Sequence, residues 1–202
     1  MNRAAPMYVR APVAIAAATY VGAAHAHLTS SGMGPLYDGL MHFLLSPEDL
    51  VPAFGLALLA GLRGREHSRR ALFTLPSAWL LGSVLGLNAA VTSVNGAWSA
   101  LWFIVVGGMV AADVKLSMRA FTVVAALVGL YHGYLNGTGM GHSVSAAIAM
   151  VGLVSAVFVL FALAAAFAVQ LHAQWARVAI RVVGSWIAAS GLLLLGWSIR
   201  GG

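Results

Sequence analysis

Long apolar stretches joined by short polar connections make up most of the chain. Six stretches reach the length that an α-helix needs to cross a bilayer, about 20 residues each. They cover residues 35–62, 71–90, 97–114, 118–135, 143–171 and 178–199. The pattern predicts an all-α, polytopic transmembrane helix bundle of about six spans. Because the connections are short, residues 27–202 are expected to form a single transmembrane domain without a separate soluble part.

The N-terminal segment has the layout of a secretory signal. Arg3 and Arg10 precede the apolar stretch 11–24, and the small-residue pattern A-x-A occupies positions 24–26. This order of a basic, an apolar and a small-residue region is typical of a cleaved signal peptide. We therefore expect residues 1–26 to be removed, which leaves His27 first; an uncleaved signal anchor is the alternative.

The composition limits the classes of protein and the chemistry that remain. Hydrophobic residues make up 61% of the chain and charged residues 8%, and the mean hydropathy is +0.91. These values indicate a membrane protein. Cysteine is absent, which excludes disulfides, thiolate ligands and thiol catalysis. The net charge of +6 comes from basic residues scattered over short loops without aromatic interleaving, so we expect no nucleic-acid partner.

The distribution of Lys and Arg predicts the orientation in the membrane. Basic residues concentrate in alternate connections, which the positive-inside rule assigns to the cytoplasm. A secretory signal independently places the mature N-terminus outside, so we expect a multi-pass protein of the bacterial inner (plasma) membrane. Asp113, His67 and His172 are expected to be solvated residues on the cytoplasmic side. The basic residues are Arg63, Arg65, Arg69, Arg70, Lys115, Arg119, Arg177 and Arg181.

The first span contains a helix start in its middle. Ser46 is a good N-cap, Pro47 suits the first helical position, and Glu48 and Asp49 follow in the first turn. The first span is therefore expected to be broken near Ser46. Broken helices are a common place for ion sites in transporters. Glu48 and Asp49 then have two interpretations, as ligands of a cation or as caps of the new helix.

Potential metal ligands gather at the predicted outer side of the spans. Asp38, His42 and Asp49 share a helical face if the first span is continuous, and His132 and Asn136 share one in the fourth span. Carboxylates inside spans are costly unless they meet a cation or a hydrated cavity. Imidazole and oxygen donors suit divalent transition metals. The candidate ligands are His42, Glu48, Asp49, His132, Asn136, His142, Asp38 and His27, with the free N-terminal amine as an additional donor if cleavage exposes His27.

At these residues the sequence resembles the HupE/UreJ family of small membrane proteins. The first-span motif of that family is similar to His-Pro-x-x-Gly-x-Asp-His: His42 matches its first histidine, Glu48 stands at the aspartate, and Asp49 replaces the second histidine. The later motif resembles His-Gly-x-x-His-Gly, where His132 matches and Asn136 stands at the second histidine. The resemblance implies a nickel or cobalt permease of a divergent branch. More oxygen donors fit harder metals such as iron or manganese better than nickel.

The leading hypothesis is a membrane permease for a divalent transition-metal cation that His and carboxylate side chains capture on the outer side. A non-transporting membrane metal-binding or metallocentre-assembly protein is the alternative. An enzyme is not expected, because the chain lacks a serine nucleophile elbow and an obvious pair of haem histidines. The expected partners are the metal cation and the lipid bilayer, and assembly into a homo-oligomer stays open.

Overall fold

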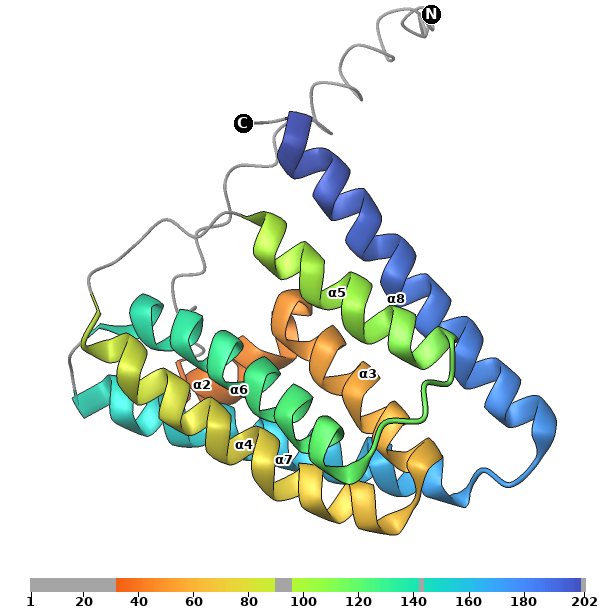
Figure 1. Ribbon diagram of the computed structural model, residues 1–202. Coiled ribbons are helices and arrows are strands. Elements are labelled where there is room, and N and C mark those ends of the chain that lie inside the picture. The colour runs from red at the N-terminus through yellow and green to blue at the C-terminus, as the bar shows by residue number, and fades with distance from the viewer. Residues whose placement is uncertain (1–31, 90–95, 142–143, 201–202) are drawn as a thin grey trace, which may run out of the picture.

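The computed structural model describes residues 32–89, 96–141 and 144–200. Within these ranges the chain is helical and contains no strand. The predicted signal peptide and the candidate ligands His27 and His142 lie outside the described residues. The helices, shown in Figure 1, are α2 (Pro35–Leu45), α3 (Pro47–Arg63), α4 (Arg65–Leu87), α5 (Gly96–Ala111), α6 (Met118–Met140), α7 (Val144–Gln170) and α8 (Gln174–Arg200).

The lengths and composition of the helices confirm a polytopic membrane protein. Helices α4, α6, α7 and α8 are each long and apolar enough to cross a membrane. Helices α2 and α3 meet this condition together, as one span bent by 72°. Helix α5 is apolar but shorter. The all-α bundle is confirmed, whereas the count of six spans and the signal peptide stay predictions.

The break of the first span falls where the sequence places it. Ser46 has extended backbone between α2 and α3, and Pro47 begins α3. The amides of Asp49 and Leu50 both donate to the Ser46 carbonyl, so the new helix starts at once. The Ser46 side chain makes no capping hydrogen bond. Proline at the first helical position and acidic residues in the first turn therefore mark this start.

Helix α3 is the central element of the bundle. It is buried almost continuously from Pro52 to Leu62, and it contacts α4, α5, α6, α7 and α8. Figure 1 shows α3 between the pair α5 and α8 on one side and α4, α6 and α7 on the other. Helices α4 and α6 pack against each other over most of their length, while α2 lies against α7. Asp49, at the start of α3, is thereby placed inside the bundle.

Three glycines allow α6 to approach α4 closely. A Cβ atom on Gly129, Gly133 or Gly137 would meet the backbone of α4 at Leu75, Trp79 or Ser83, respectively. Small residues at such spacing let transmembrane helices pack at short backbone distances, where lipid gives no hydrophobic drive for association. The approach also fixes the register that sets Trp79 beside residue 132.

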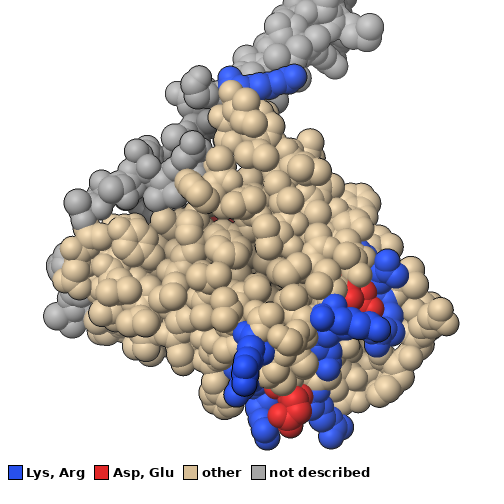
Figure 2. Space-filling model, viewed as in Figure 1, with Lys and Arg blue, Asp and Glu red and all other residues tan. Residues whose placement is uncertain are grey.

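The described basic residues other than Arg200 gather at one end of the molecule, called here the basic end. Arg63 ends α3, Arg65 opens α4, Lys115 precedes α6, and Arg177 and Arg181 lie in the first turns of α8. Figure 2 shows their shared location. Alternate connections thus share a face, as the sequence predicts.

We expect Gly133→Ala to destabilise the protein by about 1–3 kcal/mol, because the added methyl group would overlap the Trp79 carbonyl of the neighbouring helix. The free energy of unfolding, measured by denaturant titration in detergent, checks this. Gly139→Ala on the same helix is the control, since a Cβ there meets nothing within 4 Å. The control is expected to be neutral or stabilising by up to about 1 kcal/mol. Equal losses in both variants would contradict the close approach.

Candidate metal-binding site

The carboxylate of Asp49 is buried between α3 and α6. Its Oδ1 accepts a hydrogen bond from His132 Nδ1 at 3.0 Å, and its Oδ2 accepts one from Asn136 Nδ2 at 3.0 Å. Asp49, His132 and Asn136 are exposed by only 6%, 1% and 7%. His132 and Asn136 are four residues apart on α6, so one helical face presents both donors. The carboxylate is therefore held by two N–H groups of a single helix.

His42 extends this network across the break of the first span. Asn136 Nδ2 donates to the His132 carbonyl at 2.8 Å as well as to Asp49, so the amide nitrogen is fully used. The Asn136 amide oxygen then accepts from His42 Nε2 at 2.9 Å. Four side chains from α2, α3 and α6 thus form one hydrogen-bonded chain in the order His42, Asn136, Asp49, His132, which we call the polar network.

The imidazole of His132 sits among aromatic rings. Trp79 of α4 stacks on it with ring centroids 5.4 Å apart and an interplanar angle of 23°. Tyr131 meets it edge-on at 5.1 Å, and Trp102 of α5 lies 6.5 Å away. The sequence analysis did not predict the aromatic rings around His132, because their position depends on the register of α4 against α6. The spacing of Gly129, Gly133 and Gly137 could have indicated that α6 packs closely against another helix.

Several polar atoms at this place have no hydrogen-bond partner among the described residues. They are His132 Nε2, Trp79 Nε1 and Ser83 Oγ, and all three are buried. Buried polar groups are nearly always satisfied, so each unsatisfied group indicates a ligand or a water molecule. Of these three groups, His132 says most about a possible ligand. When its Nδ1–H donates a hydrogen bond to Asp49, its Nε2 has a lone pair that can bind a metal ion. That arrangement is the carboxylate–histidine pairing that orients metal-binding imidazoles.

Two further candidate ligands lie in the first turns of α2 and α3. Glu48 is exposed in the first turn of α3. Asp38 lies in the first turn of α2, one turn before His42. Within the described ranges no three His, Asp or Glu side chains are arranged to hold a metal ion. The assignment of these residues as metal ligands therefore stays a prediction. The capping interpretation fits exposed Glu48 better than Asp49, whose carboxylate bonds across to α6.

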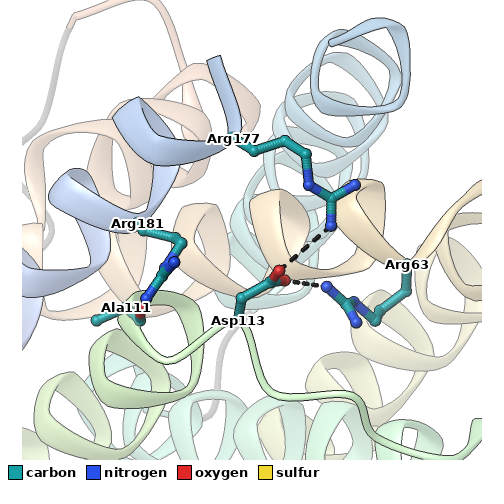
Figure 3. Close-up of polar contacts among 5 residues, drawn as sticks. All are labelled: Arg63, Ala111, Asp113, Arg177 and Arg181. Carbon is teal, nitrogen blue, oxygen red and sulfur yellow. Dashed lines mark hydrogen bonds and ion pairs between the residues drawn. The ribbon is translucent and has the colours of Figure 1, made fainter. Parts of the chain in front are cut away.

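At the basic end, the expectation that Asp113 is a solvated residue is wrong. Asp113 adopts a left-handed backbone conformation with φ of 51° just after α5, and its side chain is largely covered. Arg63 donates to its Oδ1, and Arg177 donates to its Oδ2 at 3.2 Å. Arg181 donates to the Ala111 carbonyl at 2.8 Å. Figure 3 shows these contacts, which tie together the end of α3, the end of α5 and the start of α8.

His67 also departs from that expectation, whereas His172 is exposed as expected. The His67 ring packs edge-on against Phe121 with centroids 5.7 Å apart, and its Nε2 is buried. Both corrections have the same cause. Asp113 lies just after α5 and His67 lies in the first turn of α4, so both are near helix ends, where a side chain can point back between neighbouring helices.

These features define a class: a polytopic helical membrane protein with a buried histidine–carboxylate network and one basic end. The chain belongs to the HupE/UreJ family, since residues 14–194 match the family described as HupE / UreJ protein. Protein HupE from Rhizobium leguminosarum bv. viciae is 25% identical over 198 residues, covering 93% of this chain and 98% of that protein. No solved structure was found to match the chain. The resemblance drawn from the motifs is confirmed.

We expect Asn136→Ala to lower the free energy of unfolding by about 1–3 kcal/mol, because Asp49 Oδ2 and His42 Nε2 each lose a hydrogen-bond partner inside the protein. Thermal or denaturant unfolding in detergent measures the loss. Thr138→Ala is a matched control two residues further along α6, because the Thr138 hydroxyl donates only to the carbonyl of Leu135 on its own helix. If the two variants lose the same stability, Asn136 is not a link between helices.

Proposed function

We propose that the protein is a membrane permease for a divalent transition-metal cation, with nickel or cobalt as the first candidates. Membership of the HupE/UreJ family implies a role related to nickel or cobalt transport. The predicted topology would bring the cation from the outer side, where the polar network lies, toward the basic end. No resident cofactor is needed in this scheme, because the metal ion is the cargo.

The observation that carries the proposal is the free Nε2 of His132. This atom is buried without a partner among the described residues, while Nδ1 of the same ring is fixed by Asp49. The pairing gives the ring one orientation and makes Nε2 a better electron donor. The stacked Trp79 ring restricts the imidazole further. A divalent cation that enters the bundle would meet the His132 Nε2 atom on a ring whose orientation is already fixed.

Asp49 supplies the charge that such a cation requires. Its only ion-pair partner in the described part of the chain is His132, which is charged only when protonated. With a neutral imidazole and a neutral amide as its partners, an ionised Asp49 would keep a net negative charge inside the bundle. Burial of an uncompensated carboxylate is unfavourable, and a cation nearby relieves that cost. The same carboxylate therefore orients the ligand and attracts the ion.

Further ligands would come from rearrangement of the polar network. His42 Nε2 and the Asn136 amide oxygen, which could each bind a metal ion, are hydrogen-bonded to each other at 2.9 Å. A metal on His132 could recruit the Asn136 amide oxygen or the His42 imidazole if this hydrogen bond exchanges. Few, exchangeable nitrogen and oxygen ligands suit a site that must release its ion, unlike a closed structural site.

The transported metal can be identified by comparing the uptake of different ions. An amide and a carboxylate stand where the family motif has imidazoles, so the donor set contains more oxygen. Oxygen donors shift preference toward harder ions such as manganese or iron. Uptake measurements should therefore compare nickel, cobalt, manganese and iron.

We expect Asp49→Asn to reduce metal uptake by cells about 10–100-fold, because the substitution keeps the shape but removes the charge and weakens the hold on His132. Accumulation of labelled metal by cells that express each variant measures this. Glu66→Gln is the control, since that carboxylate is exposed at the basic end and is not a candidate ligand. We expect it to retain most of the uptake.

Two outcomes would count against the permease. Uptake of all four metals that is identical in wild type, Asp49→Asn and His42→Ala would rule out transport through this site. Purified protein in sealed vesicles that binds the metal without loading the lumen would favour the alternative, a non-transporting metal-binding or metallocentre-assembly protein.

A further inference from the structure

A cavity of about 280 Å³ opens at the basic end, between the end of α3, the end of α7 and the start of α8. Three of its lining residues have basic side chains: Arg63, His172 and Arg177. The other lining residues are small or apolar, and none of them is acidic: Gly61, Leu62, Gly64, Ala168, Val169 and Leu171.

The positive charge around this cavity exceeds the negative charge that compensates it. Asp113 supplies one carboxylate to two guanidinium groups, those of Arg63 and Arg177. Arg181 adds a third guanidinium, which donates to a backbone carbonyl and has no carboxylate among the described residues. The Arg63 side chain is only 8% exposed, and its Nε has no hydrogen-bond partner in the described part. A buried cation in this state is stabilised by an additional anion.

The wall of the cavity offers apolar surface beside the charge. Leu62, Val169 and Leu171 line the cavity together with Arg63 and Arg177. An anion with an attached hydrocarbon chain can use both kinds of contact, whereas a free inorganic anion uses only the charge. The cavity also lies where helices end at the predicted cytoplasmic surface, the depth of the headgroups of anionic lipids.

We propose that this cavity binds the phosphodiester headgroup of an anionic phospholipid. Arg177 and Arg63 would donate to the phosphate oxygens, His172 would lie beside them, and an acyl chain would lie along Val169 and Leu171. The bound headgroup would join the ends of α3, α7 and α8 that Asp113 already ties in part. The proposal is independent of the metal cargo.

The test compares lipids that differ only in the headgroup. Purified protein in detergent receives phosphatidylglycerol, phosphatidylcholine of the same acyl chains, or inorganic phosphate, and the retained lipid is counted by native mass spectrometry alongside thermal unfolding. Wild type is expected to retain phosphatidylglycerol preferentially and to melt at a higher temperature with it. Arg177→Gln should lower the preference about fivefold. Arg70→Gln, an exposed arginine at the same end that does not line the cavity, should leave it unchanged.

Equal retention of the two lipids by wild type would overturn the proposal. An equal loss in Arg70→Gln would overturn it too, because the attraction would then come from the whole basic end. Stabilisation by inorganic phosphate without any by phosphatidylglycerol would replace the lipid with a free anion.

The variant Asp113→Asn tests whether the arginines bind an anion or only hold Asp113. It also replaces Arg177→Gln in the test if that variant fails to fold. Removal of the carboxylate frees both guanidinium groups, so phosphatidylglycerol preference should rise or persist even if the protein melts earlier. A loss of the preference in Asp113→Asn would mean that the arginines act only as partners of Asp113, which would overturn the proposal.

Discussion

The carboxylate of Asp49, held by two N–H groups of α6, is the interaction on which the interior of the bundle depends. It joins the start of α3 to the middle of α6, and Asn136 carries the connection on to α2 through His42. Without these hydrogen bonds three helices would present buried polar groups to one another unpaired, at a cost of about 1–3 kcal/mol for each group. The orientation of the His132 ring follows from the same contact, because the hydrogen bond to Asp49 fixes its Nδ1.

Asp49 and Asp113 are partnered in different ways. Asp113, at the basic end, lies between two permanently charged guanidinium groups and is a structural tie between helix ends. Asp49 has an imidazole and an amide, which leave its charge available. Two guanidinium groups compensate the carboxylate of Asp113, whereas that of Asp49 has no permanently charged partner among the described residues. The difference lies in the partners, since both residues are aspartates in helical surroundings.

Local chemistry explains what the sequence could predict. The break at Ser46 and Pro47 depends on helix-capping preferences within a few residues, and the shared face of His132 and Asn136 depends on helical periodicity alone. The family motifs lie on the same residues. The hydrogen-bond partners of Asp49 do not follow from the local sequence. Asp49 faces α6 while the adjacent Glu48 is exposed, and this difference depends on the orientation of α3 inside the bundle. The stacking of Trp79 on His132 depends on the register of α4 against α6, and the burial of Asp113 depends on three helix ends that meet.

The break at Ser46 has a consequence for the electrostatics of the interior. Where one straight helix would present no terminus at this depth, the break presents two, the carbonyl end of α2 and the amide end of α3. The amide end has a partial positive charge and favours the nearby anion, Asp49, in the first turn of α3. The carbonyl end has a partial negative charge, and His42 lies in the last turn of α2 beside it. Both helix ends thus lie next to Ser46, so a single bend places a carboxylate at a positive helix end and an imidazole at a negative one.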